Sequence, residues 1–147
     1  MRKVDVHILI KTDPAGVIRA FTDPSLLRDW WSVEKSFIEL RTGGLYTLAW
    51  QVTAQGIGYI TTGIIHSYHP EAELVIGNLL YINAEKPFLG PMTLRVKATG
   101  TDGGSILYLC QEGYLEGEVW EWYYHSVQEA WPEVLRGLKG YLEARPA

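Results

Sequence analysis

Cysteine is almost absent from this sequence, since Cys110 is the only one in 147 residues. A lone thiol cannot form an internal disulfide, which favours a reducing compartment, and we expect the protein to be cytoplasmic. Long apolar runs are missing too, because no segment approaches the ~20 residues that cross a bilayer. The first residues, MRKVDVHILIK, have too short an apolar stretch for a signal peptide and predict a strand. We therefore expect no membrane insertion.

Positive charge is scarce and scattered, with 13 Lys and Arg against 17 Asp and Glu and a net charge of −4. Nucleic-acid binding requires a basic stripe that displaces counterions, so this class of partner is not expected. The sequence also lacks GxSxG, HExxH and dinucleotide-binding motifs. It contains no linker or repeat, and its length predicts one domain over residues 1–147.

Histidine, carboxylate and cysteine side chains form no recognisable metal or catalytic motif. Glu121 and His125 have the spacing of two helical ligands, but a metal needs three or four, and both fall on the polar face. His66 and His69 flank a turn without a second motif, and Cys110 in its apolar strand is typical of an inert buried thiol. We expect no metal and no cofactor, and the sequence nominates no catalytic residue.

The first two thirds of the chain predict short helices followed by strands. After the strand VDVHILI, two short helices are expected, because Asp13 and Asp23 each place an N-capping carboxylate before a proline. Six segments of period two then follow between residues 36 and 114: FIEL, LYTLAWQV, YITTGII, LVIGNLLYI, TLRVKA and SILYLC. The separators, EKPFLGPM among them, are short and turn-like, which implies antiparallel neighbours.

The last segment, from Trp120 to Arg145, predicts one long helix that bends at Pro132. At 1.5 Å per residue it is roughly 38 Å long, enough to cross a whole sheet. Its apolar face carries Trp120, Tyr124, Val127, Trp131, Val134, Leu135, Leu138 and Leu142. The expected fold is α+β: a curved antiparallel sheet of about six to seven strands wrapped around this helix, with two short helices after the first strand.

A curved sheet that grips one helix can leave a pocket between the two layers. Period-two alternation places Tyr46, Leu48 and Trp50 on one strand face, which would confront the aromatic start of the helix, with Trp31 closing one end. The alternative is that the rings fill this space themselves. The candidate ligand-binding residues are Trp31, Tyr46, Leu48, Trp50, Trp120, Tyr123, Tyr124, Val127 and Trp131.

Five motifs cover nearly the whole chain in a familiar order: DPAGVIRAFTDPSLLRDWW, ELRTGG, GIIHSYHPEAELV, GGSILYLCQEGY and AWPEVLRGLKGYLE. Together they resemble the START/Bet v 1-like (SRPBCC) helix-grip superfamily, and within it the branch named for activator of Hsp90 ATPase homologue 1 (AHSA1-like). The sequence departs from the pattern where relatives often have glycine, histidine and an aromatic residue, at Ala130, Gln111 and Asn78 respectively. The resemblance implies a hydrophobic pocket in many relatives, chaperone regulation in the eponymous ones and cyclisation in a few.

Three functions are compatible with this sequence. The first is a binding protein for a small hydrophobic or aromatic molecule, lipids included, held between the sheet and the C-terminal helix. The alternative is a protein-interaction module of the co-chaperone kind, similar to the Hsp90 ATPase activator. The second alternative is a cyclase- or hydrolase-like pocket enzyme. The expected partners are a small hydrophobic molecule and, for the second function, a protein; the chain would be a monomer or a homodimer.

Overall fold

The computed structural model describes residues 2–145, apart from the side chain of Pro87. The elements follow in the order β1 (Lys3–Ile10), α1 (Pro14–Ala20), α2 (Pro24–Trp31), β2 (Lys35–Ile38), β3 (Leu45–Thr53), β4 (Gly56–His69), β5 (Glu73–Asn83), β6 (Lys86–Thr101), β7 (Gly104–Glu112) and α3 (Glu118–Ala144). Strands β2 to β7 form a meander because each connection is short, and β1 pairs with β7.

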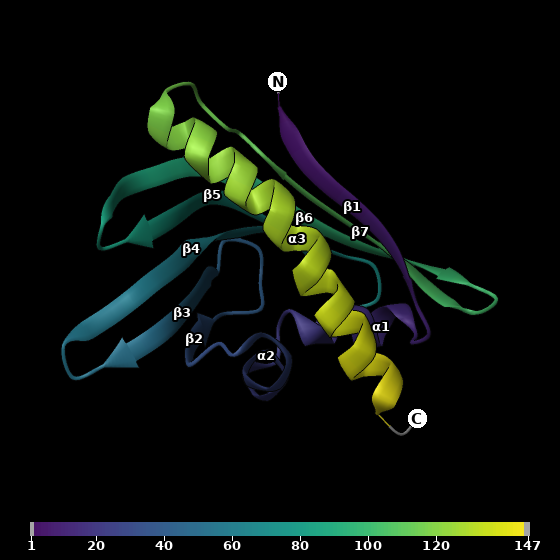
Figure 1. Cartoon of the computed structure of the whole chain (residues 1–147). Helices are drawn as coiled ribbons and strands as arrows, with labels where there is room; N and C mark the ends of the chain where they lie inside the picture. Colours follow the sequence, from purple (N-terminus) through teal and green to yellow (C-terminus); the bar gives the residue numbers. More distant parts are fainter. Residues whose placement is uncertain (1, 146–147) are drawn as a thin grey trace.

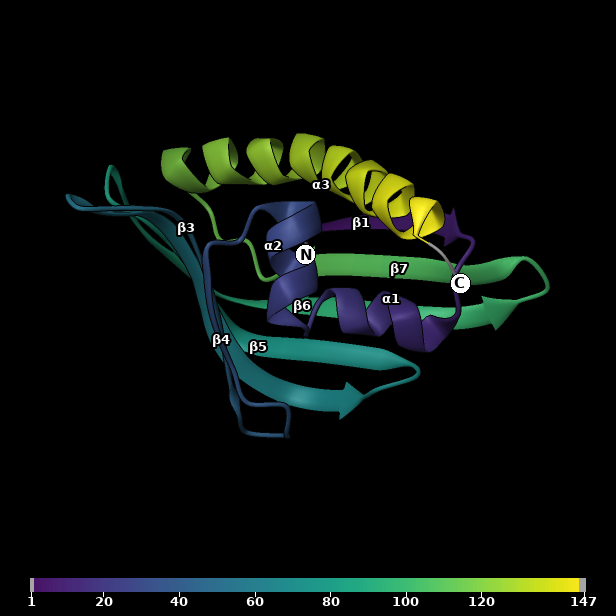
Figure 2. The ribbon, with the colours of Figure 1, turned by 90° about the horizontal axis from the view of Figure 1, so that it is seen from below.

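The strands of the described chain form one antiparallel sheet of seven, in the order β1-β7-β6-β5-β4-β3-β2. Figure 1 shows α3 crossing this sheet obliquely, and Figure 2 shows β3 and β4 rising toward its first half. Seen from below, α1 and α2 lie on the same side of the sheet as α3, with α2 beneath the middle of α3 and α1 beneath its last turns (Figure 2). The arrangement confirms the expected helix-grip fold, including the two short helices after the first strand.

Both short helices begin as the sequence predicts. The carboxylate of Asp13 accepts a hydrogen bond from the backbone N–H of Gly16, and that of Asp23 accepts one from Ser25, each at 2.8 Å. Helix α2 ends at Ser32, whose backbone is left-handed with a φ of 58°. This short, capped helix delivers Trp31 to the interior between α3 and the sheet.

The predicted connection EKPFLGPM is wrong, because β6 already begins at Lys86 and the turn is confined to Ala84 and Glu85. The pairing of β5 with β6 is irregular here: Tyr81 lies opposite Leu89, yet Leu79 lies opposite Met92. One extra residue on β6 is therefore accommodated as a bulge, where a proline costs no ladder hydrogen bond. Turn-forming residues in this segment mark the bulge and do not end the strand.

The helix α3 continues through Pro132 and arches over the sheet (Figure 2). Its second half buries Leu135, Leu138 and Leu142 against the sheet, and these residues belong to one continuous core. Its first half places aromatic rings in the same direction. The two halves thus divide the interior into an aliphatic end and an aromatic end, and the aromatic end contains the candidate site.

Candidate ligand-binding pocket

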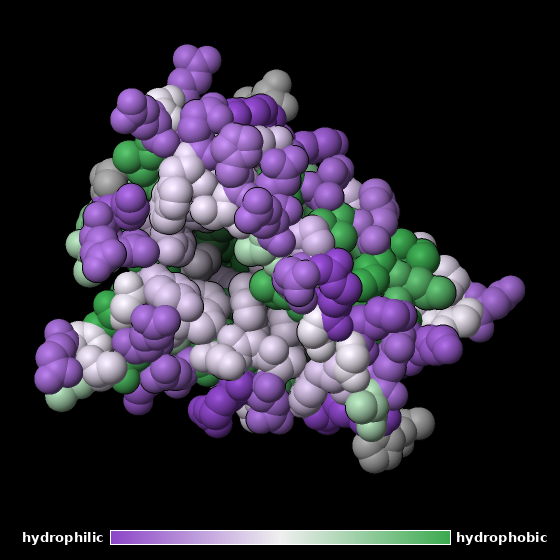
Figure 3. Space-filling view, viewed as in Figure 1, coloured by the Kyte–Doolittle hydropathy of each residue, from purple (hydrophilic) through white to green (hydrophobic). Residues whose placement is uncertain are grey.

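A cavity of about 380 Å³ lies between the first half of α3 and the curled strands β3, β4 and β5. This volume falls within the usual range of small-molecule sites, about 300–1,000 Å³. The space-filling view shows the corresponding hollow beside α3, open to the surface and surrounded by pale, neutral side chains (Figure 3). The end of α2 closes the cavity on one side, where Trp31 and Ser32 line it.

Aromatic rings from five elements follow one another around the cavity. Neighbouring ring centroids are separated by 5.0–6.4 Å, distances at which aromatic pairs attract each other. Two of the contacts are stacked and the others are tilted or edge-on, so the rings do not collapse into a single stack. In spatial order the rings are Trp131, Trp31, Trp50, Tyr59, Tyr81 and Tyr123.

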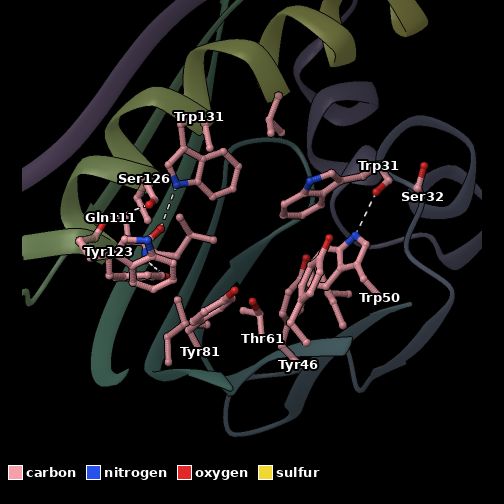
Figure 4. A pocket seen from close by; sticks show the side chains of 18 residues that line it. Trp31, Ser32, Tyr46, Trp50, Thr61, Tyr81, Gln111, Tyr123, Ser126 and Trp131 are labelled. Carbon is pink, nitrogen blue, oxygen red and sulfur yellow. Dashed lines mark hydrogen bonds between the residues drawn. The ribbon is translucent and has the colours of Figure 1, made fainter. Parts of the chain in front are cut away.

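Hydrogen bonds to the backbone hold two of the surrounding side chains in place (Figure 4). The indole Nε1 of Trp50 donates to the carbonyl oxygen of Trp31 at 3.0 Å. The hydroxyl of Tyr46 donates to the carbonyl oxygen of Phe21 at 2.6 Å, and burial raises the pKa of this phenol. Each bond restricts the rotation of a large ring. The rings therefore stay at the wall and do not fall into the space.

Gln111 connects the two ends of this series of rings. Its side-chain oxygen accepts a hydrogen bond from the indole Nε1 of Trp131 at 2.9 Å, and its side-chain nitrogen donates to the hydroxyl of Tyr123 at 3.0 Å (Figure 4). Gln111 is only 3% exposed, so these bonds compensate the cost of burying an amide. Burial also raises the pKa of Tyr123, which stays neutral at physiological pH.

No Asp, Glu, Lys, Arg or His side chain is among the described residues that line the cavity. The polar groups there are the hydroxyls of serine, threonine and tyrosine, the indole N–H groups of tryptophan and the amide of Gln111. A positive charge lies beside one wall residue, since the ammonium group of Lys86 is 4.7 Å from the ring centroid of Trp122. An ion inside the cavity would find no opposite charge, so the geometry suits a neutral molecule.

Most of the predicted site residues surround the cavity. Those that line it are Trp31, Tyr46, Leu48, Trp50, Tyr123, Val127 and Trp131. Trp120 and Tyr124 are not among the lining residues; they pack edge-on against Tyr114 with ring centroids 6.3 Å and 5.1 Å away. Because α3 crosses the sheet obliquely, its apolar face extends beyond the cavity, and these two rings cover Tyr114, just after the end of β7.

Several residues that line the cavity were not predicted from the sequence. On α3 the cavity extends to Trp122 and Ser126, beyond the edge of the apolar face. On β4, Tyr59 and Thr61 lie opposite Trp50 and Leu48 in the hairpin register, so the alternation of β3 could have been carried across the turn. The remaining wall residues without a prediction are Ser32, Leu79, Tyr81, Leu94, Gln111, Ala130 and Val134.

The pairs considered as metal ligands occupy the surface. Glu121 and His125 form an exposed pair with 3.5 Å between carboxylate and imidazole, and Arg2 binds the same carboxylate at 2.5 Å. Within residues 2–145, no three His, Cys, Asp or Glu side chains are grouped as metal ligands would be. No helix in that range is long and apolar enough to cross a membrane.

Comparison with known proteins identifies the family. Residues 11–143 match the model of the activator of Hsp90 ATPase homolog 1-like proteins, and the chain belongs to this family, as the sequence motifs suggest. The family supports a ligand-binding or co-chaperone-like module in general. A search of curated proteins found no match.

Solved structures give the same fold. The crystal structure of protein MLL2253 from Mesorhizobium loti is 21% identical and has a TM-score of 0.77, with 99% of this chain and 100% of that chain covered. The solution structure of the Aha1 dimer from Colwellia psychrerythraea is 14% identical with a TM-score of 0.72, and 98% of each chain is covered. At such identities the likeness shows the fold alone.

Proposed function

We propose that the protein binds a small hydrophobic or aromatic molecule between the sheet and the first half of α3. The observation that carries this proposal is the cavity itself, about 380 Å³ surrounded by rings that do not fill it. Protein interiors normally pack as densely as organic crystals, and a void of this size leaves many surfaces without contacts. A flat apolar ligand would restore those contacts.

The chemistry of the wall supports binding over acid–base catalysis. A general acid or base in such a site is usually a histidine or carboxyl group with a pKa near the working pH. Here the candidates are tyrosines, and burial moves the pKa of Tyr46 and Tyr123 further upward. These phenols remain protonated and can orient a ligand. They are poor proton acceptors at neutral pH.

A co-chaperone-like module is the second candidate. It is favoured by large apolar side chains that face solvent, such as Phe37 at 57% exposure and Phe88 at 71%. The family name and the dimeric relative also suggest a protein partner or a second copy. For either function we propose a cytoplasmic location and a single domain over residues 1–147.

The proposed function is tested by closing the cavity. Native mass spectrometry and solvent extraction of the purified protein should first reveal any co-purified molecule. N-phenyl-1-naphthylamine, a neutral fluorescent probe, should then bind with one-to-one stoichiometry and quench tryptophan emission. Val127→Trp, and Leu48→Trp from the opposite wall, should abolish probe binding with little change in melting temperature, because each fills an existing void.

Gln128→Trp is the matched control, since this neighbour of Val127 is exposed and lies outside the cavity. It adds the same ring to the same helix and should leave probe binding intact. If Val127→Trp and Leu48→Trp bind the probe as the unmodified protein does, the probe occupies another surface. The interaction module would then be the better interpretation.

A further inference from the structure

The direction of the hydrogen bonds in the pocket wall is fixed by Trp131. An indole N–H can donate a hydrogen bond but cannot accept one. The side-chain oxygen of Gln111 must therefore face Trp131, at 2.9 Å, and its nitrogen must face Tyr123, at 3.0 Å. The other proton of that nitrogen is directed to the sulfur of Met92, at 3.3 Å. Every donor and acceptor direction of the buried amide is thereby determined.

This fixed direction leaves one proton without an acceptor. The oxygen of Tyr123 accepts from the Gln111 nitrogen, and an amide nitrogen cannot accept a bond in return. Among the described residues, no hydrogen bond uses the phenolic proton of Tyr123. The side chain is 7% exposed and stays protonated, since burial raises its pKa. A buried donor of this kind is costly unless an acceptor, from a ligand or from water, reaches it.

The other polar groups of the wall differ from Tyr123. The hydroxyl of Tyr46 and the indole of Trp50 already donate to backbone carbonyls. Tyr81, stacked on Tyr123 with 5.0 Å between ring centroids, accepts from the Asn83 amide. Its side chain is partly exposed, so water can accept its proton. Tyr59, Thr61 and Trp31, which also line the cavity, are partly exposed in the same way. Among the described wall residues, Tyr123 is the buried one whose proton has no acceptor.

We propose that Tyr123 donates this hydrogen bond to an oxygen of the ligand, and that the pocket consequently selects neutral aromatic carbonyl compounds over hydrocarbons of the same shape. The rings of the wall would stack on the aromatic part of the ligand, and the carbonyl oxygen would lie against the α3 side. A carboxylate is a poorer ligand because no lysine, arginine or histidine lines the described wall. This inference rests on the proposed function, since it specifies the ligand class of the same cavity.

The test compares 9-fluorenone with fluorene, two planar molecules that differ by one carbonyl group. The affinities of the two molecules are measured by tryptophan quenching and expressed as the ratio of fluorenone to fluorene affinity. The two molecules differ in their free energy of transfer from water, but this difference is the same for every variant, so it cancels when the ratios of two variants are compared. Tyr123→Phe should lower the fluorenone preference about five- to tenfold and leave fluorene affinity nearly unchanged. Tyr81→Phe tests the stacked neighbour as the alternative donor. The control is Tyr141→Phe, the same change on the same helix but outside the cavity, which should leave the ratio as it is.

An infrared measurement on the unmodified protein keeps the inference testable if Tyr123→Phe folds poorly. The carbonyl stretch of bound 9-fluorenone should lie at lower frequency than in an alkane solvent, and it should return to the alkane value in Tyr123→Phe. An unshifted stretch, an unchanged ratio in Tyr123→Phe, or a ratio that falls only in Tyr81→Phe would overturn the role of Tyr123 while the apolar pocket stands. If neither molecule binds the unmodified protein, both the inference and the proposed function fail.

Discussion

Two ends of the same helix face cover very different interiors. At the aliphatic end, Leu135, Leu138 and Leu142 of α3 pack into a core that includes the fully buried Leu107 of β7. At the aromatic end, the face continues with Trp131 and the residues before it, yet a cavity of about 380 Å³ remains beneath them. The helical periodicity is the same at both ends. What differs is the shape and the freedom of the side chains.

Leucine side chains can adjust their rotamers until neighbouring atoms touch, and dense packing results. Large flat rings adjust less, particularly when a hydrogen bond fixes them at the wall. Trp50 is held by the Trp31 carbonyl oxygen and Trp131 by Gln111. An apolar helix face therefore predicts which side chains point inward. It does not predict whether those side chains pack against the opposite layer or leave a cavity.

The largest expected effect lies at the aliphatic end. Leu138→Ala should lower the free energy of unfolding by about 2–5 kcal/mol, because it removes a fully buried side chain and leaves a new cavity in a packed region. Urea denaturation followed by circular dichroism measures this loss. An apolar probe should not recover it, since the new cavity is small and closed. A loss below about 1 kcal/mol would show that this end is loosely packed as well.

Leu48→Ala is the same truncation at the aromatic end, where the side chain borders the existing cavity. Leu48 is almost fully buried too, but part of its side chain borders the cavity, so we expect a smaller loss of about 1–2 kcal/mol, mainly the transfer free energy of the removed carbons. A saturating apolar ligand should restore part of it, as measured by the shift in melting temperature. Equal losses for Leu48→Ala and Leu138→Ala would remove the difference between the two ends.

The same contrast explains how far the sequence alone could lead. The fold can be predicted because its signals depend on local chemistry: aspartate N-caps before prolines, strand segments of period two and one long amphipathic helix. The residues Tyr46, Leu48 and Trp50 were found for that reason, since strand alternation decides which face they share. The bulge in β6 was missed because its prolines have the composition of a turn.

The missed parts of the wall depend on three-dimensional relations. Because α3 crosses the sheet obliquely, Trp122 lines the cavity and Trp120 does not. The angle between the helix and the sheet cannot be predicted from the periodicity of the sequence. Gln111 follows Leu107 and Leu109 on the inward face of β7, a polar residue in an apolar alternation. Gln111 stands where relatives often have histidine, but its hydrogen-bond partners on α3 can be identified only in the folded structure.

Two buried tyrosines beside the pocket should respond in opposite directions to loss of the hydroxyl. Within the described residues, the hydroxyl of Tyr114 is buried without a hydrogen-bond partner, whereas that of Tyr46 donates to Phe21. Tyr114→Phe should therefore be neutral or raise the free energy of unfolding by up to about 1 kcal/mol. Tyr46→Phe, the matched control, should lower it by about 1 kcal/mol, because it leaves the Phe21 carbonyl oxygen unpaired. Destabilisation by Tyr114→Phe would reveal an ordered water or a partner at this hydroxyl.

The smallest expected effects concern the polar contacts that fasten each end of α3 to β1. At the aromatic end, Arg2, which directly precedes β1, forms an ion pair with Glu121 at 2.5 Å, and its guanidinium lies 4.4 Å from the ring centroid of Tyr124. At the aliphatic end, Lys139 donates to the Leu9 carbonyl oxygen, and the carboxylate of Glu143 accepts from the backbone N–H of Lys11. The two carboxylates thus form a matched pair for one experiment.

The pKa of Glu121 is lowered chiefly by the hydrogen bond from Arg2, and that of Glu143 chiefly by the hydrogen bond from Lys139. A lowered folded-state pKa stabilises the fold only while the carboxylate is charged, so this stability is present above the unfolded-state pKa of about 4.3 and is lost as the pH falls through the folded-state pKa. Glu121→Gln and Glu143→Gln should each lower the melting temperature slightly at pH 7, and the difference from the unmodified protein should disappear toward pH 3. Both carboxylates lie at the surface, Glu121 more exposed than Glu143, so added salt should weaken the effect, most at Glu121.

If the aromatic end is the more loosely packed one, Glu121→Gln should also accelerate amide exchange in the first turns of α3 more than Glu143→Gln does in the last. Equal acceleration at both ends would mean that the cavity does not loosen the helix above it.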